Sequence, residues 1–338
     1  MKSLRFFFFI IFIFIALIFC KCENKERFYR PNLPEELCSI GIIDADDTTR
    51  YISFEKSYQV EYPEDDSLRN LSFTISGSSK ELFKYQSDQT IKNLLGLKLP
   101  DSIEFNSGEM YSLIASENGT PNISAEVTVP DLPSQLTLNS ISKEITTLQT
   151  QNECVKSSTS KSAIINLSFI NNNGKKQYYA LLVEAIGGSG LSSLYIPQAG
   201  LLDFTVRETN YPGFFAEMHG LTMYHYMCNG IFISVIKSPV FGYFIDGSRI
   251  ADKICNITLT TQFNDSYSIY DFIKGFRIKL LSIPEELYLF EKSLYTYEQN
   301  AKDPFSEPVY LNGNIKGGNG VFAICRSSTL SINLSQWY

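Results

Sequence analysis

Histidine, tryptophan and closely spaced cysteine pairs are scarce in this sequence. The 338 residues include two histidines and one tryptophan, and none of the seven cysteines belongs to a C-x-x-C pair. Zinc and redox sites built on that pair are therefore excluded. The sequence also lacks G-x-G-x-x-G, a terminal G-K-[ST] and G-x-S-x-G, so it has neither a nucleotide-binding loop nor a hydrolase nucleophile elbow. We predict no cofactor.

The charged residues give no sign of a nucleic-acid partner. Acidic residues outnumber basic ones 36 to 29, for a net charge of −7, whereas nucleic-acid-binding domains carry a basic surface. The two histidines, His219 and His225, lie near Glu217, but their spacing matches no H-E-x-x-H pattern. We therefore predict no metal site, no catalytic residues and no enzymatic activity.

Only one long hydrophobic run is present, and it is at the amino terminus. Lys2 and Arg5 precede an unbroken apolar run from Phe6 to Phe19. A basic start followed by about 7–15 apolar residues is typical of a secretory signal peptide. A membrane-spanning helix needs about 20 apolar residues, so an uncleaved anchor is the weaker alternative. The sequence predicts an exported protein.

The end of this leader allows two cleavage sites. Leu17-Ile18-Phe19-Cys20 resembles a bacterial lipobox, in which the cysteine is acylated, although Phe19 stands where a small residue is usual. Cleavage after Cys22 instead yields a soluble protein that begins at Glu23. We predict lipidation of Cys20, with Cys22 as the second choice. Residues 1–22 are then the signal peptide with its lipobox, and residues 23–34 are a polar tether.

The rest of the chain favours an all-β fold in two domains. About 315 residues follow the leader, more than one core usually spans. The 25 phenylalanines and 20 tyrosines suit half-buried sheets. Pro130-Asp131-Leu132-Pro133 interrupts a series of short strands. We predict an immunoglobulin-like β-sandwich over residues 35–133 and a larger β-rich domain over residues 134–338.

Local patterns predict several individual elements. Residues 69–76 alternate polar and apolar side chains, as one strand does. Residues 162–169 and 177–184 flank Asn173-Gly174, which predicts a β-hairpin. In residues 285–300, apolar side chains recur every three or four positions after Pro284 and two glutamates, so we predict an amphipathic helix packed on a sheet. A final strand is predicted at 321–325.

Two further groups of residues are candidate sites. Asp44, Asp46 and Asp47 resemble half of a calcium-binding loop but lack its glycine and terminal glutamate, so a solvated turn is the better interpretation. Five cysteines remain outside the leader, and their pairing is left open between one or two disulfides and free buried thiols. They are Cys38, Cys154, Cys228, Cys255 and Cys325.

The carboxyl-terminal part resembles a known family. Residues 303–308 (DPFSEP) and 312–322 (NGNIKGGNGVF), together with the helix entry at 286–290, are similar to domain of unknown function family 4249. Residues 108–113 and 124–130 resemble the same family. The resemblance implies an exported lipoprotein of Gram-negative bacteria, often encoded near TonB-dependent outer-membrane transporters, with no known catalytic residues.

The segment Gly317, Gly318, Asn319 and Gly320 lies within this motif. Glycines allow a tight turn or a close backbone approach, and a structural turn is the better interpretation than a binding loop. These four residues are the candidate binding residues of the sequence, and they are weak ones.

The expected function combines these observations. We expect a non-enzymatic cell-envelope lipoprotein of the outer membrane, on its periplasmic face or the cell surface, that acts as a binding or accessory subunit. The membrane, reached through the lipid, and an outer-membrane transporter are the expected partners. The alternative is a secreted or surface adhesin that binds glycan or peptide through tyrosines of residues 178–226.

Overall fold

The computed structural model describes residues 36–48, 50–56, 67–78, 80–92, 94–148, 158–171, 176–187, 204–206, 214–217, 226–228, 231–233, 242–250, 253–264, 273–300, 307 and 309–333. The chain separates into two compact units, Met1–Pro34 and Glu35–Tyr338, and all described residues belong to the second. The predicted leader, its two cysteines and the tether lie outside the described residues. No helix of the described part is long and apolar enough to span a bilayer.

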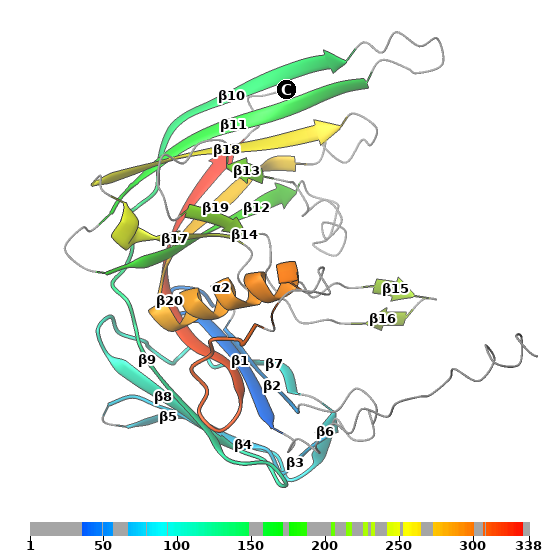
Figure 1. The fold of residues 1–338 in the computed structure, drawn as a ribbon, viewed down its shortest axis with the longest axis vertical. Coiled ribbons are helices and arrows are strands. Elements are labelled where there is room, and N and C mark those ends of the chain that lie inside the picture. Colours follow the sequence, from blue (N-terminus) through cyan, green and yellow to red (C-terminus); the bar gives the residue numbers. More distant parts are fainter. Residues whose placement is uncertain are drawn as a thin grey trace, which may run out of the picture. The chain divides into compact units, whose positions relative to one another are not determined.

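The described residues form mainly β-strands, with one α-helix (Figure 1). The predicted all-β class is therefore confirmed. The elements are β1 (Leu37–Asp44), β2 (Tyr51–Lys56), β3 (Ser67–Arg69), β4 (Ser72–Ser76), β5 (Glu81–Gln86), β6 (Thr90–Lys92), β7 (Leu94–Lys98), β8 (Met110–Ser116), β9 (Ile123–Thr128), β10 (Thr137–Leu148), β11 (Ser158–Ile170), β12 (Tyr178–Gly187), β13 (Phe204–Val206), β14 (Phe214–Glu217), β15 (Tyr226–Cys228), β16 (Ile231–Ile233), β17 (Gly242–Asp246), the short 3-10 helix η2 (Gly247–Arg249), β18 (Ile254–Asn264), β19 (Ile273–Ile283), α2 (Glu285–Asn300) and β20 (Asn319–Asn333).

An eight-stranded sheet, called the central sheet below, organises the fold. Its strand order is β14-β17-β12-β19-β20-β1-β2-β7. Two four-stranded sheets accompany it, with the orders β5-β4-β8-β9 and β10-β11-β18-β13, and two small pairs complete the described strands, β3-β6 and β15-β16. In Figure 1 the β10-β11-β18-β13 sheet lies above α2, and the β5-β4-β8-β9 sheet lies below it.

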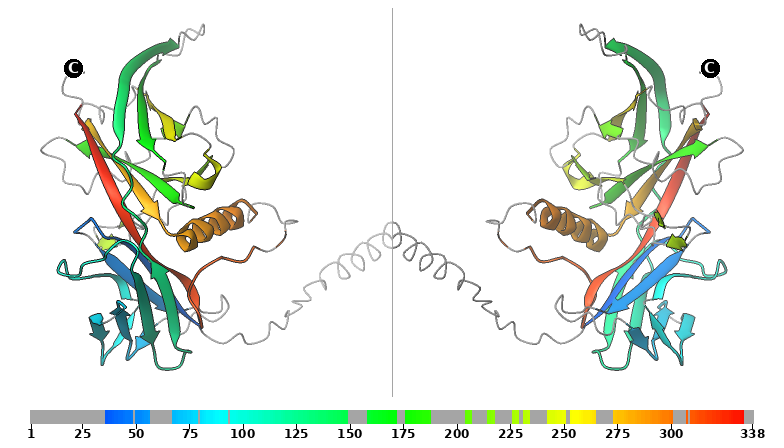
Figure 2. Two further views of the ribbon diagram at one scale, coloured as in Figure 1. Left: turned by 90° about the vertical axis from the view of Figure 1, so that its left-hand side faces the viewer. Right: turned by 90° about the vertical axis from the view of Figure 1, so that its right-hand side faces the viewer.

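Both four-stranded sheets pack on the same face of the central sheet. In β20, Phe322 and Ile324 belong to the core under β4, β8 and β9, and Ile332 belongs to the core under β11 and β18. These three residues have even numbers, and side chains two positions apart along a strand share one face. Val321 and Ala323 point to the other face, where α2 packs. Figure 2 shows the strands and α2 from two further sides.

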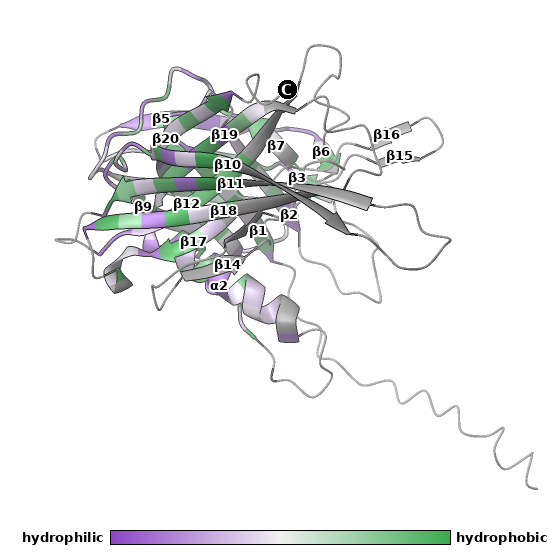
Figure 3. Cartoon of the chain, turned by 90° about the horizontal axis from the view of Figure 1, so that it is seen from above, coloured by the Kyte–Doolittle hydropathy of each residue, from purple (hydrophilic) through white to green (hydrophobic). Residues whose placement is uncertain are grey.

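The alternation of buried and exposed side chains explains why these segments form strands. In β9, the residues Ile123, Ala125 and Val127 are buried, whereas Glu126 and Thr128 are exposed. Figure 3 shows apolar and polar residues interspersed along the described strands. Burying one face while solvating the other is the normal state of an antiparallel sheet.

The predicted helix is confirmed over its full length as α2 (Glu285–Asn300). It packs on the central sheet through Leu287, Tyr288 and Phe290, which are all buried, and Tyr288 stacks on Tyr178 of β12 with ring centroids 4.4 Å apart. Glu285 in the first turn accepts a hydrogen bond from the Tyr178 hydroxyl (3.1 Å) and pairs with Lys176. These contacts fix the start of the helix to the sheet.

The predicted β-hairpin between residues 162–169 and 177–184 is wrong, although both strands exist. The strand β11 pairs with β10 and β18, whereas β12 pairs with β17 and β19. The connection therefore crosses from one sheet to the other. Buried Asn171 holds this crossing, because its backbone N–H donates to Lys253 O (2.8 Å) and its side-chain amide donates to Gly247 O (3.0 Å).

Two other strand predictions need correction. The predicted strand over residues 69–76 is divided into β3 and β4 at Asn70, whose φ of 51° lies in the left-handed region. The predicted final strand over residues 321–325 continues to Asn333. Its first part, residues 319–325, pairs in parallel with β1, and its second part, residues 326–333, pairs antiparallel with β19.

The strand β20 therefore pairs with strands from both halves of the chain, β1 and β19. The predicted boundary at residues 130–133 and the immunoglobulin-like character of residues 35–133 stay predictions. The structure adds that β1 and β2 lie in the same sheet as β12 and β19, joined through β20.

The close approach of β20 to β1 yields a stability prediction. Gly320 has a φ of +113°, and a Cβ atom built there would lie 1.9 Å from Ser39 O of β1. We expect Gly320→Ala to lower the free energy of unfolding by about 3 kcal/mol or more, because the two backbones must separate. Urea unfolding of the purified protein measures this loss.

Gly108 supplies the matched control. Its φ is also positive, at +79°, but a Cβ atom there meets nothing within 4 Å. Gly108→Ala therefore costs only the left-handed backbone penalty of about 1–2 kcal/mol. Equal losses for the two variants would show that backbone contact at Gly320 contributes nothing beyond its φ.

Candidate functional site

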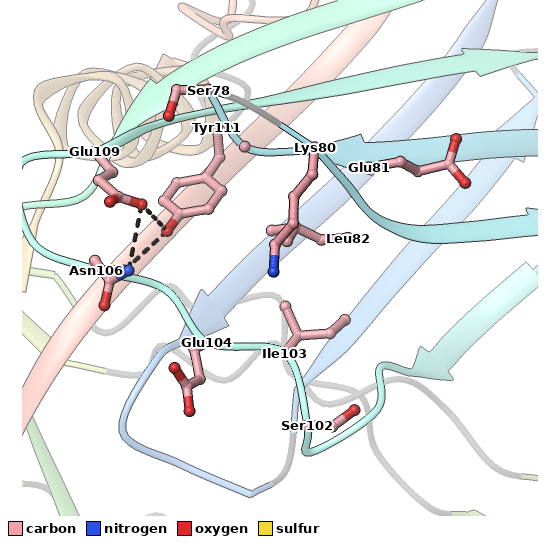
Figure 4. Close-up of a pocket in the computed structure, with 11 residues that line it drawn as sticks. Ser78, Lys80, Glu81, Leu82, Ser102, Ile103, Glu104, Asn106, Glu109 and Tyr111 are labelled. Atoms are coloured by element: carbon pink, nitrogen blue, oxygen red, sulfur yellow. Dashed lines mark hydrogen bonds between the residues drawn. The ribbon is translucent and has the colours of Figure 1, made fainter.

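A polar pocket opens beside the first strand residues of β8 (Figure 4). It encloses about 430 Å³ and is bordered by the β4–β5 turn (Gly77–Leu82), the loop Ser102–Asn106 and the start of β8. Glu81, Glu104 and Glu109 bring carboxylates to the pocket, and Lys80 brings one ammonium group. The pocket therefore offers hydrogen bonds and charge to a small polar molecule.

Tyr111 is the structural centre of this pocket. Its hydroxyl donates to Glu109 Oε2 (2.8 Å) and accepts from the backbone N–H of Asn106 (2.9 Å). Burial, together with the hydrogen bond to Glu109, raises the pKa of Tyr111. The ring is 2% exposed and packs edge-on against Phe105, with centroids 5.1 Å apart. It therefore fixes the loop at Asn106 and presents no ring face on which a sugar stacks.

A second opening, called the β9 groove below, lies where β8 and β9 approach the segment before β20. It encloses about 460 Å³ and has nine lining residues. Four parts of the chain supply them: the start of β8, the end of β9, the first turn of α2, and residues 313–316. The lining residues are Met110, Glu126, Val127, Thr128, Glu286, Gly313, Asn314, Ile315 and Lys316.

Residues 312–316 are held in place by hydrogen bonds to three elements. The backbone N–H of Asn312 donates to Ser293 Oγ of α2 (2.8 Å). The Asn314 side chain donates to Phe322 O (2.8 Å) and to Glu126 O (3.2 Å), and it accepts from Phe322 N (2.9 Å). Lys316 forms a two-way backbone bridge with Ser124 of β9. The wall of the β9 groove is therefore fixed by hydrogen bonds of its backbone and of the Asn314 side chain.

The predicted binding residues lie next to this groove rather than in it. A Cβ atom at Gly317 would lie 2.4 Å from Asn122 O, and one at Gly318 would lie 2.1 Å from Leu37 O. Asn319 hydrogen-bonds with Glu36 through its side chain. These residues thus serve the tight passage of the chain into β20. The groove residues 313–316 stand four positions earlier in the same motif, and composition alone gave no sign of them.

The acidic segment at Asp44, Asp46 and Asp47 forms a turn in which Asp46 is exposed, as the sequence suggested, but its carboxylates are engaged in ion pairs. Arg326 donates to both carboxylate oxygens of Asp46, with Nε 2.9 Å from Oδ2 and Nη2 3.0 Å from Oδ1. The backbone N–H of Ser327 also donates to Asp46 Oδ2 (2.8 Å). Lys279 pairs with Asp47 and with Asp44, at 3.3 Å from Asp44 Oδ2.

These ion pairs neutralise the carboxylates that a calcium ion would need as ligands. Burial lowers the pKa of Lys279, but its bonds to Asp47 and Asp44 outweigh burial, so the net shift is upward. Hydrogen bonding to Asp46 raises the pKa of Arg326. Among the described residues, no group of three or more histidine, cysteine or acidic side chains is placed to hold a metal ion.

The cysteines and histidines complete the predicted candidates. Cys255 and Cys325 are buried free thiols, and Cys38 is partly buried. Burial raises the pKa of Cys255 to about 12. His219, His225 and Cys154 lie outside the described residues, as do the lipidation candidates Cys20 and Cys22.

Comparison with known proteins gives a family and no function. The sequence profile of a domain of unknown function (DUF4249) matches residues 29–331, which covers every described residue up to Ser331. No curated protein matches the chain.

The ion pair between Asp46 and Arg326 predicts a measurable contribution to stability. Asp46→Asn removes the charge from a partly buried, two-pronged pair, and we expect the free energy of unfolding to fall by about 1–2 kcal/mol. Asp101→Asn is the control, because its pair with Lys98 is about half exposed on both sides (49% and 56%). Exposed pairs contribute about 0–1 kcal/mol. If the two variants lose similar free energies of unfolding in urea, the pair at Asp46 contributes no more than an exposed pair.

The burial of the thiols predicts their order of alkylation. Iodoacetamide attacks the thiolate, so a buried thiol with a raised pKa reacts slowly at pH 8. We expect Cys38 to be modified in the folded protein well before Cys255 and Cys325, and all three to react in urea. Peptide mass spectrometry reads each site separately. Failure of these thiols to react in urea without reductant would mean that they are oxidised.

Proposed function

Because the chain belongs to the DUF4249 family, which has no assigned function, we propose that it is an exported, non-enzymatic binding or accessory protein of the bacterial cell envelope. The leader carries this proposal: a basic start, the apolar run Phe6–Phe19 and Cys20 in a lipobox-like setting, followed by polar residues. This arrangement is typical of secreted proteins. Lipid on Cys20 then holds the protein on the outer membrane.

The described residues support a binding role more than a catalytic one. The Tyr111 hydroxyl is engaged by Glu109 and Asn106, and Asp46 is engaged by Arg326. Such residues fix loops rather than act on a substrate. Both openings are lined mainly by polar side chains, which suits recognition of a partner at the surface. The binding role is therefore argued from these two openings, because a β-rich fold alone implies no particular function.

We propose an outer-membrane TonB-dependent transporter as the partner, by analogy with the family. A secreted adhesin that binds through exposed tyrosines is less well supported. Tyr178 and Tyr179, the described tyrosines at the start of that region, are buried at 6% and 1% exposure and belong to the cores.

The proposal predicts the chemical state of the mature amino terminus. In a Gram-negative host, we expect the purified protein to begin at Cys20 with two or three acyl chains, seen as added mass on the terminal peptide. Cys20→Ala removes this mass and releases the protein from membranes, because one cysteine carries the whole anchor. Cys22→Ala is the matched control and leaves the protein on the membrane.

An unmodified terminus at Glu23 would contradict the anchor and leave a soluble secreted protein. The same membranes test the partner: crosslinking followed by purification through the lipidated protein recovers an outer-membrane barrel protein if the partner is a transporter. Recovery of the chain alone from crosslinked membranes would count against the transporter.

A further inference from the structure

The outer edge of β9 is only partly paired. On its inner side, Val129 N donates to Glu109 O (3.0 Å) and Gly108 N donates to Val129 O (2.8 Å), in continuation of the pairing with β8. On its outer side, Ser124 exchanges both backbone hydrogen bonds with Lys316, at 3.0 and 2.7 Å. Because successive residues of a strand face opposite edges, the backbone groups of Glu126 and Thr128 also face outward.

This outer edge remains open beyond Lys316. Glu126 O accepts from the Asn314 side chain (3.2 Å). Within the described part of the chain, the N–H of Glu126 and both backbone groups of Thr128 have no protein partner. An open edge is a template for another extended chain, which adds to the sheet through main-chain hydrogen bonds. Lys316 already occupies the first position of such a strand.

The β9 groove lies along this open edge and supplies side-chain contacts. Glu126 and Glu286 bring two carboxylates that have no ion-pair partner among the described residues, in contrast to Glu285, which pairs with Lys176. Met110 on β8 is a large apolar side chain at 51% exposure. Two carboxylates against the one ammonium group of Lys316 leave the groove net negative, and together with Met110 they favour a segment with basic and aliphatic character.

We propose that the β9 groove binds an extended peptide segment with basic side chains, which adds as a fifth strand beside β9. The peptide backbone pairs with Glu126 and Thr128, and its lysine or arginine side chains meet Glu126 and Glu286. This inference deepens the proposed function, on which it rests, by naming the class of partner that the binding protein takes: an exposed, extended loop or terminus of another protein.

A second copy of the chain fits this edge less well than a basic peptide. In a two-fold antiparallel pairing of β9 with itself, the same surface meets on both sides, so the Glu126 carboxylates of the two copies approach each other. Like charges on adjacent strands are destabilising. The charge of the groove therefore selects against self-association and for a basic partner.

The experiment uses the purified processed protein and two synthetic eight-residue peptides as probes. One alternates lysine and threonine, and the other alternates glutamate and threonine. Fluorescence anisotropy of the labelled peptides measures binding, and amide hydrogen exchange reports on Glu126 and Thr128. We expect saturable binding of the lysine peptide, weaker binding of the glutamate peptide by about tenfold or more, and slower exchange at both amides.

Variants separate the edge from general effects. Thr128→Pro removes one outward N–H without touching the β8 ladder, and it should weaken binding by about tenfold or more. Gln86→Pro is the matched control at the opposite edge of the same sheet. Gln86 is the last residue of β5 as Thr128 is of β9, and because Ser87 N bonds inward to Leu71 O, the N–H of Gln86 faces outward. This variant should bind as the parent does. Glu126→Lys should reverse the preference in favour of the glutamate peptide.

Three results would overturn the inference: no saturable binding of the lysine peptide, an equal loss of binding in Gln86→Pro, or a dimer in solution that is broken by Thr128→Pro. The same titration on Cys20→Ala keeps this outcome separate from the anchor. If the protein without lipid binds the peptide, the groove proposal is supported and only the membrane attachment is lost. If the lipidated protein binds no peptide, the anchor is supported and the groove proposal is wrong.

Discussion

The pairing of β20 on both of its edges is the constraint on which the rest of the described fold depends. Its first part lies parallel to β1, which begins the described chain, and its second part lies antiparallel to β19. A parallel contact between segments this distant in sequence closes a very long loop, which costs more chain entropy than a local pairing does. Its side chains then complete all three cores, through Phe322 and Ile324, Ile332, and Val321 and Ala323. Both halves of the chain therefore share this strand in their cores.

The position where β20 changes partners is also where the ion pairs gather. The last residue of β1, Asp44, stands opposite Cys325, and the pairing with β19 begins at the next residue, Arg326. At this point β1 must leave the sheet, and Asp46 holds Arg326 and Ser327 N while Lys279 of β19 holds Asp44 and Asp47. Charge-assisted bonds suit such a corner, since they fix direction as well as distance. The acidic run is therefore explained by topology rather than by a metal.

Local patterns predicted individual elements well and their partners poorly. The helix from Glu285 followed from its apolar spacing and first-turn acids, because both signals lie within the segment itself. The Asn173-Gly174 pair suggested a hairpin, but the pairing of β11 with β18 depends on residues more than 80 positions away, and the anchor at Asn171 is recognisable only in three dimensions. The same limit applies to the site: the motif pointed to Gly317–Gly320, whereas the groove arises where residues 313–316 meet β9 and α2, and no local spacing encodes that meeting.

The close approach of the chain at Gly317 and Gly318 determines where the wall of the β9 groove lies. To enter β20 beside β1, the chain must pass close to Leu37 and Asn122, which Gly317 and Gly318 allow. The segment just before this passage must therefore lie along β9, and it covers the edge only at Ser124 before Asn312 turns away toward α2. Natural sheets usually protect an open edge by shortening, charging or covering it. Here the cover stops after the Ser124–Lys316 pair and leaves the outward backbone positions of Glu126 and Thr128 open beside an exposed methionine. An edge left open next to a built wall is better explained by use than by incomplete protection, because the same segment would have closed it by continuing its pairing with β9 through residues 314 and 312.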